Sequence, residues 1–254
     1  MSVLAAENLS KVYGEKKGNY ATKALDGIDL KVEEGEFIAI MGPSGSGKST
    51  LVSILSGITK PTGGSVEICG KCIDKMDPFE MALFRRRKLG FVFQEFNLLD
   101  NLTLQENVML PMVLDKKESS YMKEKSLEIM KLFEIDQLAD KRPYQISGGQ
   151  QQRAAVSRAL VNDPVIVFAD EPTGNLDSKS ANAVMTCFEK INTERRVTAL
   201  IVTHDVFAAS FCRKVIFIKD GKIFMDIVRK GTRKEFFEKI LDCQAIVGGE
   251  NNGL

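Results

Sequence analysis

A glycine-rich loop between an apolar run and an amphipathic run constrains this chain more than any other feature. Residues 42–49 match the pattern G-x-x-x-x-G-K-[ST] between a predicted strand, Phe37–Met41, and a predicted helix, Lys48–Leu55. Glycines let the backbone curl so that its N–H groups surround an anion, and the helix N-terminus and Lys48 add positive potential. The sequence therefore predicts a P-loop for ATP, built from Gly42, Pro43, Ser44, Gly45, Ser46, Gly47, Lys48, Ser49 and Thr50.

Two adjacent carboxylates end a later apolar run. Asp170 closes the predicted strand Val165–Ala169, and Glu171 follows it directly. Together with the Ser49 hydroxyl, Asp170 can hold Mg²⁺ beside the phosphates. The Glu171 side chain is directed differently from that of Asp170 and can orient or deprotonate an attacking water. Alternatively, Asp-Glu-Pro could simply begin a turn and have no catalytic role. The presence of a P-loop in the same chain makes this interpretation the weaker of the two.

The order of predicted elements indicates an α/β fold. Apolar strands alternate with helices after Val165, which predicts a mostly parallel sheet covered on both faces. Short strands and turns before Asp77 predict an antiparallel β lobe, and residues from about 78 to 160 are mostly helical in pattern. We expect one domain over 1–254 with a P-loop NTPase (RecA-like) core and an inserted helical subdomain at about 78–160. The last predicted helix spans Arg233–Leu241.

Composition narrows the possible partners. Lys plus Arg is 35 against 34 for Asp plus Glu, so no whole-molecule field attracts nucleic acid, and we expect no nucleic-acid partner. No apolar run reaches the roughly 20 residues of a membrane span, and the first residues lack the pattern of a signal peptide. These features predict a protein that stays in the cytoplasm and reaches a membrane only through a partner.

Cys69-Gly70-Lys71-Cys72 allows two interpretations. A redox pair or half of a zinc site is possible in principle, but a zinc site needs two further ligands, and His204 is the only histidine. The flanking residues resemble strand, so a hairpin with Gly70-Lys71 as its turn is favoured. The other three cysteines, Cys187, Cys212 and Cys243, have apolar neighbours and are predicted to pack in the core.

Between the P-loop and the two carboxylates, Ile146-Ser147-Gly148-Gly149-Gln150 resembles the signature motif of the ABC-type ATPases, with Ile146 where leucine is commonest. A serine hydroxyl and glycine amides at a helix start are suited to bind phosphate. A lone S-G-G-Q would be weak evidence, but the resemblance extends over nearly the whole chain. It implies that Ser147, Gly148, Gly149 and Gln150 contribute to ATP binding.

The resemblance assigns further roles. Gln94 corresponds to the Q-loop glutamine, which contacts Mg²⁺ and the attacking water, and His204 corresponds to the switch histidine near the γ-phosphate. Asn175-Leu176-Asp177 resembles the D-loop at the dimer interface. Tyr13 resembles the aromatic residue that stacks on adenine, with Tyr20 as an alternative. Catalysis is thus expected from Glu171, His204 and Gln94, and metal binding from Ser49, Gln94 and Asp170.

In this family two ATP-binding domains face head to tail, and each ATP lies between one P-loop and the other signature motif. The resemblance therefore implies a homodimer that closes on ATP and Mg²⁺ and opens after hydrolysis. A ligand can drive such a change because it contacts the closed and open states differently.

Family members without a membrane span usually drive a separate permease, which places them at the cytoplasmic face of the membrane. Phe96–Leu99 and Leu102–Val108 resemble the branch for macrolide export, lipoprotein release and resistance to bacitracin-type peptides, as does the C-terminal stretch 233–240 with Gly248-Gly249. Two alternatives stay open: a regulator or mechanical coupler that transports nothing, and a lipoprotein-release ATPase. We expect Gln94–Asp100 to touch the permease. The basic run Arg85–Lys88 is either a solvated helix face or a contact with acidic loops or lipid headgroups.

Overall fold

A six-stranded sheet forms the centre of the molecule. The computed structural model describes residues 2–14 and 21–248. The strand order is β10-β9-β3-β8-β7-β6, with all neighbouring pairs parallel except β10, which runs antiparallel to β9. The strands are β3 (Phe37–Met41), β6 (Leu89–Val92), β7 (Ile166–Asp170), β8 (Ala199–Val202), β9 (Lys214–Lys219) and β10 (Lys222–Val228). The predicted parallel α/β sheet is confirmed.

A second, antiparallel sheet covers one side of the core. Its order is β2-β1-β4-β5, with β1 (Ser2–Tyr13), β2 (Thr22–Glu33), β4 (Gly63–Ile68) and β5 (Lys71–Cys72). The Cys-x-x-Cys segment is a hairpin as predicted, but its turn is Cys69-Gly70, because Ile68 pairs with Lys71. Both turn residues have positive φ, 48° and 75°, which a two-residue turn of type I′ requires. Within the described residues, no group of three or more metal-ligating side chains exists.

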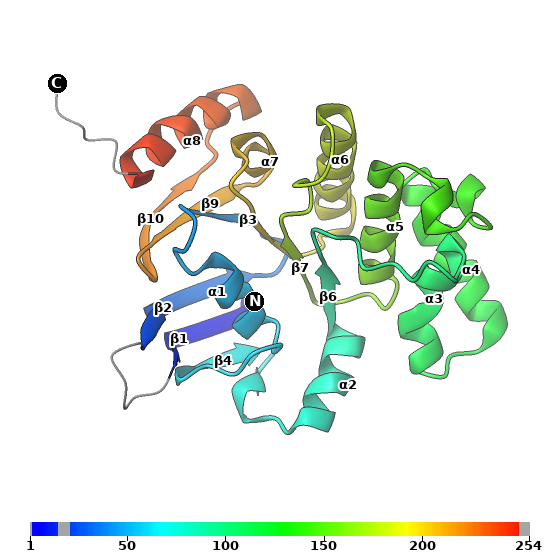
Figure 1. The fold of residues 1–254 in the computed structure, drawn as a ribbon, viewed down its shortest axis with the longest axis horizontal. Coiled ribbons are helices and arrows are strands. Elements are labelled where there is room, and N and C mark those ends of the chain that lie inside the picture. The colour runs from blue at the N-terminus through cyan, green and yellow to red at the C-terminus, as the bar shows by residue number, and fades with distance from the viewer. Residues whose placement is uncertain (1, 15–20, 249–254) are drawn as a thin grey trace.

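Helices surround the central sheet (Figure 1), and α3, α4 and α5 gather to one side of it. The α-helices are α1 (Lys48–Leu55), α2 (Pro78–Lys88), α3 (Leu104–Leu114), α4 (Ser119–Leu132), α5 (Gly148–Leu160), α6 (Ser178–Arg195), α7 (Val206–Ser210) and α8 (Arg233–Gly248). Short 3₁₀ helices span Ile73–Lys75, Asp136–Leu138 and Pro143–Gln145. No described helix has the length and apolar character needed to span a bilayer.

Alternation along the strands gives the sheet two hydrophobic cores. Phe37, Ala39 and Met41 of β3 face the core formed with helices α3 to α8. Ile38 and Ile40 face the other core, which the β lobe and α1 complete. Because both faces of the sheet are buried, the strand sequences are continuous apolar runs. Polar residues that could take part in catalysis therefore lie in the loops after the carboxyl ends of the strands.

The structure differs from the sequence prediction in two elements. The segment from 78 to 160, expected to be helical, contains strand β6, which pairs with β7 in the central sheet. Helix α2 leads directly into β6, so it belongs with the sheet, and the helices that stand apart from the sheet begin at α3. The C-terminal helix α8 continues to Gly248, seven residues beyond Leu241. The treatment of 1–254 as one domain stays a prediction.

The three arginines of the basic run at the end of α2 have partners within the chain, and Arg87 and Lys88 are also exposed to solvent. Arg85 donates to the Gly57 carbonyl at 2.7 Å, and Arg86 donates to the Leu114 carbonyl at 2.7 Å. Arg87 pairs with the Asp115 carboxylate at 2.7 Å. These contacts tie α2 to the loop after α1 and to the end of α3.

Candidate functional site

Four loops meet at one edge of the central sheet. The P-loop follows β3, and His204 lies just after β8. Asp170 ends β7 and Glu171 follows it, while Gln94 lies just after β6. Strands β3, β8, β7 and β6 are parallel neighbours in this order. Their carboxyl ends therefore lie side by side, which is where α/β sheets of this type bind ligands. The fold thus brings together most of the predicted site residues.

The P-loop is shaped by two close backbone approaches. Gly47 has φ of 102°, and a Cβ there would lie 2.4 Å from the Ala24 carbonyl oxygen of β2. A Cβ at Gly42 would lie 2.1 Å from the Ile218 carbonyl oxygen of β9. Any larger residue would push the loop away from its neighbouring strands, so the glycines are needed for space as well as for conformation.

Lys48 lies over its own loop. Its Nζ donates to the carbonyl oxygens of Gly42 and Pro43, each at 2.9 Å. Burial lowers the pKa of the Lys48 ammonium, and the carboxylates of Glu171 and Asp170 oppose that shift. The start of α1 has no side-chain cap and no acidic residue in its first turn. An uncapped helix end beside a cation is suited to bind phosphate.

Asp170 is prepared for a cation. Its Oδ1 is buried without a hydrogen-bond partner, and the nearby Ser49 side chain favours its charged form. Burial raises the pKa of Asp170, as does the neighbouring Glu171, while Lys48 and Ser49 lower it. A buried carboxylate with an orphaned oxygen, next to a hydroxyl, fits the oxygen ligands that Mg²⁺ prefers.

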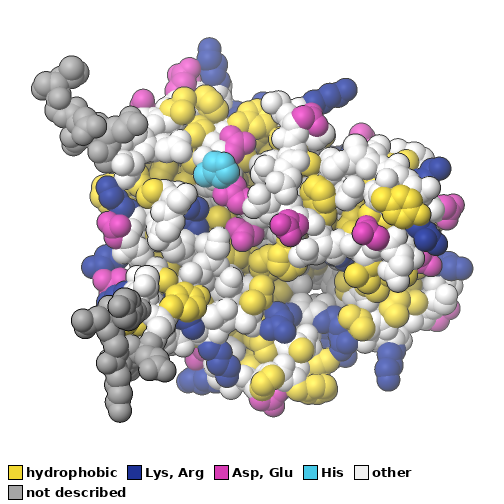
Figure 2. Space-filling model, viewed as in Figure 1, with side chains coloured by type: hydrophobic (Ala, Val, Ile, Leu, Met, Phe, Trp, Pro, Cys, Tyr) yellow, Lys and Arg dark blue, Asp and Glu magenta, His cyan; other side chains and the backbone are white. Residues whose placement is uncertain are grey.

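Glu171 and His204 form a pair. His204 Nδ1 lies 2.9 Å from Glu171 Oε1, and because an ionised carboxylate only accepts, Nδ1 carries the hydrogen. Glu171 has φ of 47°, which turns its side chain away from the direction of Asp170. The Glu171 side chain is 15% exposed and that of His204 is 72% exposed. Figure 2 shows the histidine on this open face with acidic side chains beside it. Glu171 Oε2 is buried and has no hydrogen-bond partner, so its capacity to accept a hydrogen bond is unused.

Gln94 is held by the segment after Glu171. Its Nε2 donates to Asn175 Oδ1 at 3.3 Å, and Asn175 Nδ2 donates to the Gln94 carbonyl at 3.3 Å. The chain thus joins the loop after β6 to the Asn175–Asp177 segment. Asn175 was expected at a dimer interface, and the structure adds this second contact within one chain.

The signature motif lies away from the P-loop of its own chain. Ser147 caps α5 by accepting from the Gln150 N–H at 3.4 Å, while Gln150 Oε1 accepts from the Ser147 N–H at 3.0 Å. Gly149 packs against Ser180 of α6. Figure 1 shows α1 and α5 on different sides of β7, and among the described residues no hydrogen bond joins Ser147–Gln150 to residues 42–50. One chain therefore presents two separate half-sites.

Tyr13 lies at the end of β1, opposite Thr22 of β2. Its ring is 44% exposed, with the Lys11 ammonium 5.1 Å from the ring centroid. Ala24, two residues after Thr22 on β2, adjoins the P-loop at Gly47, so the end of β1 lies on the strand pair that borders the P-loop. Tyr20, the alternative, lies outside the described residues.

Two polar residues that the sequence did not single out support the site. Gln152 is fully buried, and its Nε2 donates to the carbonyls of Pro172 at 2.8 Å and Phe93 at 3.4 Å. Gln244 of α8 donates to the His204 carbonyl at 3.5 Å. Gln152 lies four residues after Gly148, on the same face of α5, which was the only local signal for it.

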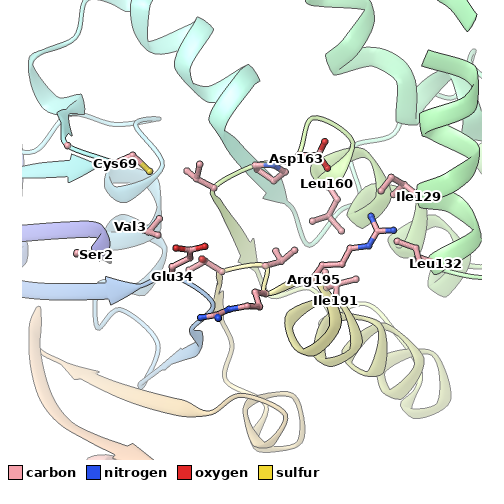
Figure 3. Close-up of a pocket in the computed structure, with 16 residues that line it drawn as sticks. Ser2, Val3, Glu34, Cys69, Ile129, Leu132, Leu160, Asp163, Ile191 and Arg195 are labelled. Carbon is pink, nitrogen blue, oxygen red and sulfur yellow. The ribbon is translucent and has the colours of Figure 1, made fainter. Parts of the chain in front are cut away.

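A cavity of about 740 Å³ lies elsewhere (Figure 3). Leu132, Ile191 and Arg195 line one side, and Val3 and Cys69 line the other. It adjoins the starts of β7 and β8, at the opposite end of the sheet from the P-loop.

Comparisons with known proteins agree with this geometry. The family model described as ABC transporter matches residues 25–174. The uncharacterized ABC transporter ATP-binding protein YvcR of Bacillus subtilis is 50% identical over 98% of this chain and 96% of its own length. The bacitracin export ATP-binding protein BceA of Halalkalibacterium halodurans is 46% identical over 99% of both chains. The dimeric post-hydrolysis structure of the cassette MJ0796 of Methanocaldococcus jannaschii, bound to ADP and Pi, covers 90% of this chain and all of its own, with 40% identity and a TM-score of 0.81.

Proposed function

This chain belongs to the ABC transporter family of ATP-binding proteins, and we propose that it hydrolyses ATP to drive a separate membrane permease in the export of, or resistance to, bacitracin-type peptides. The observation that carries the proposal is the edge of the sheet where Lys48, Asp170, Glu171 and His204 meet. The substrate class rests on the similarity to BceA, since none of these residues distinguishes one transported molecule from another.

The roles of the residues follow from their contacts. The P-loop amides and the uncapped start of α1 hold the phosphates, and Lys48 exchanges its loop carbonyls for phosphate oxygens. Glu171 accepts the proton of the attacking water at Oε2. His204 holds Oε1 through Nδ1, which leaves the other oxygen directed to the water. Tyr13 stacks on adenine.

Asp170 and Ser49 are the residues that would hold Mg²⁺, with Gln94 at its edge. The ion would neutralise charge on the β and γ phosphates. Burial raises the pKa of Asp170, and a bound cation would oppose that shift by favouring the ionised carboxylate.

Two copies complete each other. Ser147–Gln150 lies far from its own P-loop, so the second half of each ATP site comes from a partner copy, as the dimeric MJ0796 cassette suggests for this chain. The permease would meet the segment Gln94–Asp100, which places the protein at the cytoplasmic face of the membrane.

Replacing Glu171 by Gln tests the catalytic assignment. The amide keeps the shape but cannot take a proton, so we expect the hydrolysis rate to fall by about 100-fold or more while ATP affinity stays within a few-fold of that of the wild type. Size-exclusion chromatography should show a lasting ATP-bound dimer. Rapid hydrolysis by Glu171→Gln would contradict the proposal.

The transport role needs the membrane partner. The chain and its co-purified permease, rebuilt in lipid vesicles, should move or release bacitracin in an ATP-dependent way, and the Glu171→Gln complex should not. Hydrolysis without any movement of peptide would favour a regulatory coupler instead.

A further inference from the structure

The loop after β6 contains two consecutive residues in the left-handed conformation. Phe96 has φ of 58° and Asn97 has φ of 49°. This conformation is unfavourable for residues with a Cβ, and asparagine tolerates it better than phenylalanine. The surroundings must therefore hold the turn. Gln94 lies only two residues before it, so the shape of the turn sets the position of Gln94.

Arg158 of α5 provides this support. Its guanidinium donates to the carbonyl oxygens of both left-handed residues, at 2.8 Å to Phe96 and through NH1 to Asn97. None of the described carboxylates forms an ion pair with Arg158. Burial lowers the pKa of its guanidinium. A partly buried cation with only carbonyl partners depends on these two hydrogen bonds to offset its loss of water.

The same helix contacts this loop at two other places. Gln152 donates to the Phe93 carbonyl at 3.4 Å, just before Gln94. The Phe96 ring lies beside Gly148, where an added Cβ would be 3.5 Å from it. Helix α5 begins directly after Ser147 of the signature motif. Its contacts with the loop therefore run from its first residue to Arg158.

We propose that Arg158 is a positioning residue that holds Phe96 and Asn97 in the left-handed conformation, and so keeps Gln94 at the ATP edge and in register with the signature helix. The effect on hydrolysis rests on the proposed function, whereas the hold on the turn does not. Lysine should replace Arg158 poorly, because its single nitrogen cannot take the places of the two guanidinium nitrogens that each meet a different carbonyl.

Hydrogen exchange on the nucleotide-free protein tests the hold directly. The N–H groups of Phe96, Asn97 and Leu99 are hydrogen-bonded within this region, so they report its opening. In Arg158→Lys and Arg158→Gln we expect these amides to exchange about ten-fold faster than in the wild type. Adding Asn97→Gly should slow exchange again by at least about threefold, after correction for intrinsic rates, because glycine adopts positive φ without strain.

Hydrolysis gives the second readout. Arg158→Lys should lower kcat by about ten-fold, while KM for ATP stays within about twofold of the wild-type value. Adding Asn97→Gly to this variant should raise kcat again by at least about threefold. Arg153→Lys is the matched control, because Arg153 lies on the same helix but donates to the Phe133 carbonyl away from the turn. It should change neither the exchange of 96–99 nor the response to Asn97→Gly.

Unchanged exchange in both Arg158 variants, or a defect that Asn97→Gly leaves untouched, would overturn the proposal. Thermal unfolding of each variant shows whether it is folded. Arg158→Lys keeps the apolar stem of the side chain, so this variant is expected to fold. If Gln94→Ala hydrolyses ATP like the wild type, the assigned role of Gln94 fails, while the exchange result still decides the role of Arg158.

Discussion

Lys48 illustrates how one side chain can prepare a loop for its ligand. Without phosphate its ammonium is shared between two carbonyls of the loop that it serves, and burial already lowers its pKa. The nearby Asp170 and Glu171 carboxylates favour the charged form. Phosphate oxygens can replace the two carbonyls, so the cation never loses its partners during binding.

Replacing Lys48 by Ala should weaken ATP binding by about ten-fold or more, because the amides of the P-loop alone bind a triphosphate less tightly than amides with a cation. Titration with a fluorescent ATP analogue measures this. Lys234→Ala is the control, because it also removes one lysine charge, but from an exposed side chain on α8 that is not part of the P-loop. Equal affinity in Lys48→Ala and wild type would refute the P-loop assignment.

At the scale of elements, α5 is packed more tightly than its glycine-rich start suggests. Gly149 lies against Ser180, and a Cβ there would be 2.7 Å from the Ser180 side chain. At Gly148 the same atom would make only ordinary contacts at 3.5 Å. Gly149 therefore sets the separation of α5 from α6, which begins after the Asn175–Asp177 segment.

Gly149→Ala should accordingly lower the free energy of unfolding by about 2 kcal/mol relative to Gly148→Ala, because the added methyl overpacks the contact with α6. Denaturant unfolding measures both variants. Ser180→Gly in the Gly149→Ala background should recover part of the loss. Equal stability of the two alanine variants would show that α5 can shift freely.

The link between α2 and α3 should depend on pH. The hydrogen bond from Arg87 lowers the pKa of Asp115, and the charge of Arg86 adds to this. A carboxyl whose folded-state pKa lies below its unfolded value stabilises the fold above the unfolded pKa and loses this effect as pH falls through the folded pKa. Asp115→Asn should thus cost about 1 kcal/mol at pH 7, and this cost should shrink as the pH falls below the ordinary value of 3.8 and through the lower folded-state pKa. A cost that stays constant with pH would argue against the ion pairs.

For the whole molecule, the proposed function requires each chain to carry two halves of different ATP sites. The P-loop lies at the carboxyl edge of the sheet, and the signature motif lies on the helices beside it (Figure 1). A head-to-tail pair brings each P-loop to the other signature motif. Closure then depends on ATP because the phosphates contact both chains.

Mixing two inactive variants tests this arrangement. In a dimer of Lys48→Ala with Ser147→Arg, one site carries both defects and the other has neither. An equal mixture should therefore regain up to about a quarter of wild-type hydrolysis, since half of the dimers are mixed and each has one intact site. Each variant alone should stay inactive. If mixing restores nothing, the sites do not form between chains in this way.

The sequence alone determined the features that rest on contiguous residues. The P-loop, the strand that ends in Asp170 and Glu171, the helix Lys48–Leu55 and the α/β order were all readable, because local spacing decides them. The hairpin turn was predicted at Gly70-Lys71 but lies at Cys69-Gly70, because the pairing of Ile68 with Lys71 sets the register.

Only the tertiary structure decided which distant groups meet. Strand β6 has four residues and follows a charged helix, so its place beside β7 left no clear local pattern. Arg87 meets Asp115 28 residues away, and Arg158 meets Phe96 62 residues away. Such contacts depend on how strands and helices pack, and a side chain's own neighbours in the sequence carry no record of its partner. Glu171 was predicted from its position after Asp170 and His204 from the family resemblance, but their 2.9 Å contact came from the fold.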